Sequence, residues 1–380
     1  MIPNMFLENG LGSEVYLCSD RVLHIGQSDN WSCGYRNLQM LLSVLLITLG
    51  QQISSTKYSD GDKFLTGIDN DLSSNVTTED NSIDSDEECV VIDLIDLTDD
   101  ACSTTVHSGQ ESYGKISANE TTGSCHPLVS QYFQNLELPD LATLQLHIEE
   151  AWKEQFDEEG ALHYGGQLRG SKEWIGAVEV ASLLNYFYCD ATVIQFIEKT
   201  KSRATLGAFV YWYFNSAVDT EASEILKKAT HNFVLSEGSL HKSMVNLVGG
   251  GRVGVFKGSK FPLYLQWKGH SVSIIGIEIS KKTSLSKLKS YNKNQTATTL
   301  GDINLLCFDP QKKSQTMKAQ LLSASVASTK KSSGSSWQQS IRLPVTKLMI
   351  KDCQIICCRS AVLSEYQRSH RKKNAAIFTA

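Results

Sequence analysis

The sequence predicts an α+β protein of the papain-like kind, in which a central buried helix packs on a mainly antiparallel sheet. Three observations lead to this prediction. Residues 38–49 are apolar on nearly every side, which is the pattern of a helix buried all round. Helical patterns dominate the first half, and runs that favour β-structure dominate the second. A single cysteine stands directly ahead of the buried helix.

The length and the cysteine pattern predict a protein with a large core and reduced thiols. The chain has 380 residues, 41% of them apolar, and ten cysteines that form no CxxC pair and no framework spacing. We therefore expect neither disulfides nor zinc fingers. The first residues lack the pattern of a signal peptide, and the longest apolar run is too short to span a bilayer. These features predict a soluble protein of the cytoplasm, the nucleus or both.

Charge divides the chain into three parts. Residues 51–125 hold 16 acidic residues against three lysines, a net charge of −13, whereas the whole chain carries −5 and the remainder therefore +8. The acidic segment is poor in aromatic residues and has no helical or alternating period, so we predict a disordered insertion. It separates the start of the folded domain, 1–50, from its remainder, 126–380. The basic residues elsewhere form no stripe interleaved with aromatic residues, so a nucleic-acid partner is not expected.

The remaining elements follow from periodicity. Residues 141–156 and 174–188 show the spacing of amphipathic helices, and the second leads into a strand at 190–197. Residues 207–214 fit a helix or a strand equally well.

Strands are predicted in the C-terminal half, where β-branched and aromatic residues gather. They cover 262–267, 270–279, 303–308 and 353–363. The Lys- and Ser-rich segments 280–300 and 311–338 lack apolar periodicity, so we predict exposed basic loops there.

Cys33 is the first candidate for chemistry, because it stands where the buried helix begins. Unsatisfied N–H groups and the helix dipole favour a negative charge at that point. The pKa of the thiol is therefore expected to fall from ~8.5 toward the range of reactive cysteines. The alternative is a small buried hydrophobic residue, which is what most free cysteines are.

His270 and Asp309 are the predicted partners of Cys33. His270 opens one predicted strand and Asp309 closes the next. If these strands pair antiparallel, Asp309 arrives opposite His270 whatever the length of the loop between them. The carboxylate would orient the imidazole, and the imidazole would take the thiol proton. Taken singly, each residue also fits a structural role.

Gln27 lies six residues before Cys33 and is a candidate donor to an oxyanion, together with the backbone N–H of Cys33. A solvated loop glutamine is the alternative. His24 and Asp29 are weaker local candidates, and Tyr35, Arg36 and Asn37 are expected to anchor the first turn of the helix.

The segment WSCGYRNLQMLL, residues 31–42, resembles the nucleophile segment of the UFSP/ZUFSP cysteine proteases, in which a glycine usually stands where this chain has Ser32. The similarity continues through 147–161, 174–184, 262–278, 305–310 and 353–363. It implies a papain-like fold and cleavage after the C-terminal glycine of ubiquitin or a ubiquitin-fold modifier. Cys33, His270 and Asp309 match the triad positions, and Gln27 has the papain-like oxyanion spacing.

The residue after Pro310 separates the two branches of this family. Members that process the ubiquitin-fold modifier carry Asp-Pro-His, whereas Gln311 follows Pro310 here. His270, in the segment Gly-His-Ser, fits the deubiquitinating ZUFSP branch, for which hydrolysis of Lys63-linked ubiquitin chains is the implied activity. A protease specific for the ubiquitin-fold modifier and a non-catalytic binding module remain the alternatives.

The acidic insertion contains an apolar island that resembles a pair of SUMO-interacting motifs. A short apolar strand flanked by acids can add to the edge of a partner's sheet. Residues 90–98 are therefore predicted to bind SUMO; the alternative is an edge strand or chance. The residues that would make the contact are Val91, Ile92, Asp93, Leu94, Ile95 and Leu97.

The sequence thus predicts a cysteine isopeptidase, a deubiquitinase whose partners are ubiquitin or ubiquitin chains. No cofactor or metal is expected, because the thiol, the imidazole and the carboxylate suffice for acyl transfer. Trp31, Trp174 and Trp267 are predicted walls of a narrow tunnel for the Gly-Gly tail. A basic run at 368–373 is compatible with nuclear import.

Overall fold

The computed structural model describes residues 13–18, 22–57, 138–197, 202–217, 220–235, 254–257, 260–280, 303–326, 340–348, 352–373 and 377–379. The acidic segment beyond residue 57, with its predicted SUMO-binding residues, lies outside the described residues. So do residues 281–302 and 327–339.

A mixed sheet of nine strands forms the centre of the described structure, in the order β3-β1-β5-β4-β8-β2-β9, with β6 paired to β5 and β7 paired to β6. Among the described strand pairs, β1–β3 and β2–β9 are parallel and the others are antiparallel. All four predicted C-terminal strands are present. The bounds are β1 (Ser13–Leu17), β2 (Cys189–Phe196), β3 (Gly254–Lys257), β4 (Leu263–Trp267), β5 (His270–Ser280), β6 (Ile303–Phe308), β7 (Arg342–Pro344), β8 (Cys353–Val362) and β9 (Ile377–Thr379).

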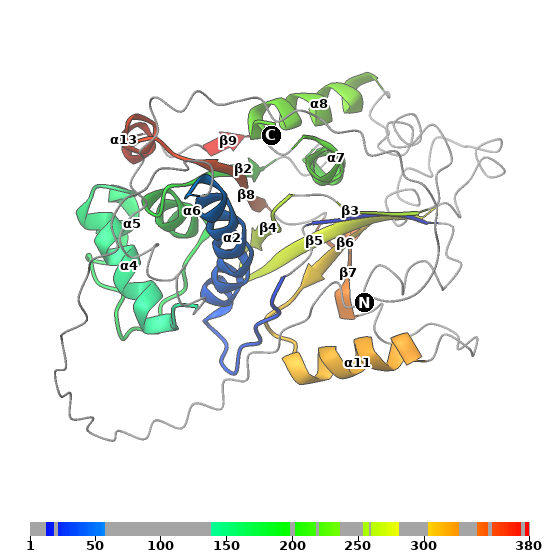
Figure 1. The fold of residues 1–380 in the computed structure, drawn as a ribbon, viewed down its shortest axis with the longest axis horizontal. Helices are drawn as coiled ribbons and strands as arrows, with labels where there is room; N and C mark the ends of the chain where they lie inside the picture. Colours follow the sequence, from blue (N-terminus) through cyan, green and yellow to red (C-terminus); the bar gives the residue numbers. More distant parts are fainter. Residues whose placement is uncertain are drawn as a thin grey trace.

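Helices cover the sheet on both sides. Figure 1 shows α2, α4, α5 and α6 on one side, and α7 and α8 on the other. The predicted α+β fold is confirmed, and none of the described helices has the length and apolar character needed to cross a bilayer. The bounds are α2 (Cys33–Lys57), α4 (Leu141–Lys153), α5 (Glu158–His163), α6 (Ala177–Tyr186), α7 (Ser202–Asn215), α8 (Ala222–Leu235), α11 (Ser314–Val326) and α13 (Glu365–Lys373), with a 3₁₀ turn η5 at Val345–Leu348.

Helix α2 is the central helix that the apolar run predicts. Its side chains Leu38, Met40 and Leu41 are fully buried, and the helix packs mainly on β5. Burying each such side chain stabilises the fold by roughly 1.5–3 kcal/mol. The helix continues to Lys57, seven residues past the predicted end of the first part of the domain.

Two segments are settled by tertiary packing. Residues 207–214, which fit either element, belong to α7, and Phe209 and Tyr211 contact aromatic rings of β2 and β1. The predicted loop over 311–338 is wrong for residues 314–326, which form α11. Good helix formers fill this helix, but its described anchors are the buried Ser314 and Met317 and not an apolar stripe, so periodicity could not reveal it.

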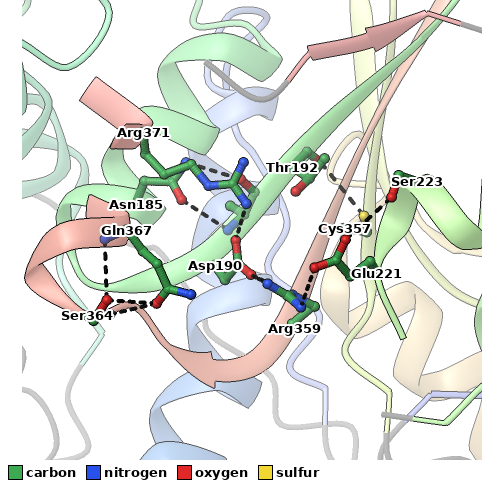
Figure 2. A network of polar contacts seen from close by, with 11 residues as sticks. Asn185, Asp190, Thr192, Glu221, Ser223, Cys357, Arg359, Ser364, Gln367 and Arg371 are labelled. Carbon is green, nitrogen blue, oxygen red and sulfur yellow. Dashed lines mark hydrogen bonds and ion pairs between the residues drawn. The ribbon is translucent and has the colours of Figure 1, made fainter. Parts of the chain in front are cut away.

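The C-terminal helix α13 is fixed to the sheet by charge pairs. Figure 2 shows the carboxylate of Asp190 on β2 between Arg359 of β8 and Arg371 of α13. Asp190 is 1% exposed, so its charge requires these partners. Arg368 and Lys372 pair with Glu154 of α4. The basic run at 368–373 is thus held on the domain surface through three of its cations.

Candidate active site

Cys33 is the first residue of α2, as the sequence predicts. The turn before it is closed by Asp29, whose Oδ1 accepts from the backbone N–H groups of Trp31 and Ser32 at 2.9 and 2.7 Å. The carbonyl of Ser32 accepts the first helical hydrogen bond, from Arg36 N–H. The thiol of Cys33 is buried, but it lines a groove, so a substrate can reach it.

His270 opens β5 directly after a tight turn. Trp267 at the end of β4 pairs with His270, and Gly269 between them has a φ of 86°, a conformation that favours glycine. The indole of Trp267 lies edge-on to the imidazole, with ring centroids 5.3 Å apart. The hairpin therefore fixes the orientation of the imidazole at the end of the sheet.

Asp309 meets His270 because β5 and β6 are antiparallel, as predicted. Ser273 pairs with Phe308, and the chain then places the Asp309 carboxylate 2.9 Å from His270 Nε2. The same carboxylate oxygen accepts from Gln311 N–H at 3.0 Å. Because Nε2 is held by Asp309, Nδ1 is the nitrogen available to the Cys33 thiol. The structure thus brings all three predicted residues together.

The electrostatics of the three groups favour a thiolate beside an imidazolium. Burial opposes the imidazolium, but the hydrogen bond to Asp309, and then the interaction with Cys33, raise the pKa of His270 to about 9. Burial also opposes the Cys33 thiolate, yet interactions with His270 and Ser271 lower the pKa of the thiol below its ordinary value. The pKa of Asp309 is lowered, against burial, by His270. At neutral pH the three groups therefore stabilise one another in their charged forms.

Asn37 ties the cysteine helix to the histidine strand. Its Nδ2 donates to the Cys33 carbonyl at 2.8 Å and to Ser271 Oγ at 3.0 Å, and its Oδ1 accepts from Ser273 Oγ at 2.8 Å. The sequence predicts the anchoring role of Asn37 but not that of Ser271, which contacts the thiol. The position of Ser271 directly after His270 was the one sequence feature that could have indicated this contact.

A groove with a volume of about 340 Å³ runs past Cys33 and His270. Of the three predicted tryptophan walls, Trp174 lines it, whereas Trp31 and Trp267 do not. The wall formed by residues 174–176 lies directly on the first turn of α2, because a Cβ on Gly34 would come within 2.7 Å of Ile175 Cγ1. The lining residues are Cys33, His163, Tyr164, Trp174, Ile175, Gly176, Ala177, Val178, Glu179, Gln266, Gly269, His270, Ser271 and Gln354.

Glu179 brings a half-buried carboxylate into this groove. Its Oε2 accepts from Gly176 N–H at 2.7 Å at the start of α6, and no cation pairs with it among the described residues. Burial raises its pKa, against the hydrogen bond from Gly176. Sequence reasoning missed this residue, because a glutamate three residues into a helix also fits an ordinary capping role.

Gln27 forms hydrogen bonds with the loop that follows Asp309 and with its own turn. Its backbone N–H donates to the Pro310 carbonyl at 2.7 Å, and its Nε2 donates to the Asp29 carbonyl at 2.9 Å. It is not among the residues that line the groove. In the described part of the chain, no cluster of three His, Cys, Asp or Glu side chains is suited to hold a metal ion.

The model of Peptidase family C78 matches residues 123–343, more than half of the chain. The chain belongs to peptidase family C78. The match contains His270 and Asp309. Cys33 precedes the matched region and lies on the N-terminal side of the acidic segment. C78 membership, with a cysteine helix packed on a mainly antiparallel sheet, confirms the papain-like fold and the cysteine-protease class that the resemblance implies.

Similar proteins include two named zinc finger-containing ubiquitin peptidase 1. The Macaca fascicularis protein is 29% identical over 247 residues, 65% of this chain and 33% of its own length, and the Homo sapiens protein is 29% identical over 243 residues, 64% and 32%. Ubiquitin carboxyl-terminal hydrolase mug105 of Schizosaccharomyces pombe is 27% identical over 151 residues, 39% of this chain and 45% of its own length. This chain spans about a third of the length of the Macaca fascicularis and Homo sapiens proteins.

Among solved structures, that of UfSP from C. elegans matches 92% of this chain and 35% of its own chain, with 10% identity and a TM-score of 0.34.

Proposed function

We propose that this chain is a thiol-dependent deubiquitinase, which hydrolyses the bond after the C-terminal glycine of ubiquitin. The observation that carries the proposal is that Cys33 and His270 line one groove and that Asp309 binds His270 from behind. The relatives named as ubiquitin peptidases support ubiquitin as the modifier.

The acylation step follows from the charge states of the site. The Cys33 thiolate attacks the glycine carbonyl, and the electron pair of its C=O bond moves to oxygen. When the tetrahedral intermediate collapses, the C–N bond breaks and His270 Nδ1 gives its proton to the departing lysine amine. The product is a thioester between Cys33 and the modifier. Asp309 keeps the imidazole oriented throughout.

The second step regenerates the thiol. Neutral His270 takes a proton from a water molecule, whose oxygen attacks the thioester carbonyl. Collapse breaks the C–S bond, which leaves the Cys33 thiolate beside a protonated His270 and frees the modifier's carboxylic acid, whose proton passes to solvent. The reaction balances with water alone.

The oxyanion donors of this proposal are the backbone N–H of Cys33 and the side chain of Gln27. The second role requires the Gln27 amide to turn from the Asp29 carbonyl toward the site, which costs one hydrogen bond of about 1 kcal/mol. A Gln27→Ala variant should then lose kcat by roughly 10²–10³-fold. An unchanged kcat would leave Gln27 a structural residue.

The residue after Pro310 favours ubiquitin over the ubiquitin-fold modifier. Gln311 stands where the processing branch has its histidine, and it binds Asp309 through its backbone. Separately, Glu179 is a half-buried groove carboxylate that pairs with no cation among the described residues, and it favours a tail that carries a basic side chain close to its glycines. Glu179→Gln should therefore narrow the difference in kcat/KM between Arg-Gly-Gly and Gln-Gly-Gly fluorogenic peptides.

Activity probes test the proposal directly. Wild type, Cys33→Ala and His270→Ala are incubated with electrophilic probes made from ubiquitin, SUMO and the ubiquitin-fold modifier. A ubiquitin adduct should form with wild type alone. An adduct with Cys33→Ala reassigns the nucleophile, and an adduct formed only with the ubiquitin-fold modifier selects the processing protease. Binding without any adduct selects the non-catalytic module.

The finer features are proposed on the sequence alone. Cleavage of Lys63-linked chains is tested with a panel of linkage-defined diubiquitins. SUMO binding through residues 90–98, which lie outside the described residues, is tested by deleting residues 85–100; SUMO binding should be lost while cleavage of a fluorogenic ubiquitin substrate persists. A cytoplasmic or nuclear location is tested by imaging the tagged full chain.

A further inference from the structure

A second buried histidine lies next to the proposed triad. His24 is fully buried, and its ring is edge-on to Phe308, with centroids 5.3 Å apart. Its Nε2 lies 3.1 Å from the backbone carbonyl of Asp309, and its Nδ1 lies 2.8 Å from Ser314 Oγ. The ring therefore bridges the residue that orients His270 and the first turn of α11.

The partners of His24 fix the direction of each hydrogen bond. A carbonyl oxygen only accepts, so Nε2 carries the proton and Nδ1 accepts from the Ser314 hydroxyl. Ser314 Oγ in turn accepts from Gly26 N–H at 3.0 Å. Burial, with a smaller contribution from Lys312, lowers the pKa of His24 to about 4 against the opposing effect of Asp309. At neutral pH the ring therefore stays neutral. Gly26 N–H donates to Ser314 Oγ, the Ser314 hydroxyl donates to His24 Nδ1, and His24 Nε2–H donates to the Asp309 carbonyl.

These contacts join two loops that both serve the site. One loop, residues 24–27, leads to the proposed oxyanion residue Gln27, and the other, residues 309–314, carries Asp309. They meet a second time where Gln27 N–H donates to the Pro310 carbonyl at 2.7 Å. They are also in close contact at Gly26, since a Cβ there would lie 3.2 Å from the Lys312 carbonyl oxygen. His24 is the side chain that bridges the two loops.

We propose that His24 is a positioning residue, which holds the Asp309 loop against the segment leading to Cys33 so that the carboxylate stays aligned with His270. The inference rests on the proposed function. It assigns α11 a role as well, because the Ser314 hydroxyl at its start is the partner of His24 Nδ1. His24 acts through Asp309 and touches neither the substrate nor the thiol.

Two substitutions separate positioning from packing. His24→Gln keeps a donor at the position of Nε2 and should retain the bond to the Asp309 carbonyl. His24→Asn mimics Nδ1 and cannot reach that carbonyl. We expect kcat on a fluorogenic ubiquitin substrate to fall about 10–100-fold in His24→Asn, with KM within about twofold, and considerably less in His24→Gln. His370→Asn, on the exposed face of α13, is the matched control.

A second measurement does not depend on the modifier. The rate at which iodoacetamide alkylates Cys33 is followed against pH by peptide mass spectrometry in the full chain. A misaligned Asp309 lowers the pKa of His270, so the alkaline limit of the ion-pair range should fall by roughly half a pH unit or more in His24→Asn and in Ser314→Ala. If the modifier is not ubiquitin, this shift still appears while the ubiquitin substrate fails.

The proposal is overturned if His24→Asn and His24→Gln lose kcat equally, or if the variants lower only the melting temperature while the pH profile of Cys33 stays that of wild type. Should His24→Asn fail to fold, the comparison of Ser314→Ala with wild type decides by the same pH profile.

Discussion

Replacing Asp309 by asparagine tests the electrostatic account of the site. The substitution keeps the shape of the side chain and a hydrogen-bonding oxygen but removes the charge. The pKa of His270 is about 9 against an ordinary 6.5, and Asp309 supplies the largest of the interactions that raise it. In the variant, burial lowers the pKa of His270 with less opposition from neighbouring charges. We therefore expect the pKa of His270 to fall by about 1–2 units, at about 1.36 kcal/mol per unit.

The direction of the resulting pH effect follows from the ion pair. The thiolate of Cys33 is stabilised only while His270 is protonated, so activity is lost as pH rises through the pKa of His270. In Asp309→Asn the alkaline limb of kcat/KM should move to lower pH by the same 1–2 units, and kcat/KM at the optimum should drop by roughly 10²–10⁴-fold. The assay is hydrolysis of a fluorogenic ubiquitin substrate between pH 5 and 10.

An exposed aspartate supplies the control. Asp352→Asn removes an equal charge at a surface position and should leave the profile unchanged. If Asp309→Asn keeps the wild-type alkaline limb, the raised pKa of His270 does not come from Asp309, and the reasoning about the dyad is refuted. A loss of activity with no shift would point to a positional effect of the substitution alone.

Three further predictions concern stability and the groove. Asp190→Asn leaves Arg359 and Arg371 facing a neutral buried group and should destabilise the fold by about 3–5 kcal/mol in urea titrations. Gly34→Ala drives a Cβ against Ile175 in the groove wall and should lower kcat/KM by about tenfold or more in the fluorogenic assay. Ser32→Ala removes a fully buried hydroxyl that has no partner in the described structure, and should raise the melting temperature by roughly 2 °C.

Each of these has a contradicting outcome. Glu221→Gln removes the exposed partner of Arg359 and should cost less than about 1 kcal/mol, so an equal loss in both variants would deny the importance of burial. A Gly34→Ala variant with wild-type kinetics would mean that the wall adjusts freely. A lower melting temperature in Ser32→Ala would reveal a partner for the hydroxyl.

The sequence by itself determined the helix that begins at Cys33 and the strands that carry His270 and lead to Asp309. These are local or pairwise patterns: an all-apolar run, alternating β-branched residues and a cysteine at a helix start. Antiparallel pairing of neighbouring strands then brings His270 and Asp309 to one end regardless of the loop between them. The proximity of His270 and Asp309 could therefore be predicted despite the long segment between their strands.

Only the tertiary structure decided which side chains from distant segments surround the triad. Glu179, His24 and Ser314 carry no periodic or spacing signal that distinguishes them from capping, packing or loop residues. Helix α11 was missed for the same reason, since its described buried anchors are too few to make a stripe. The His24–Ser314 contact joins segments nearly 300 residues apart, and it exists because a buried polar group must find a hydrogen-bond partner wherever the fold supplies one.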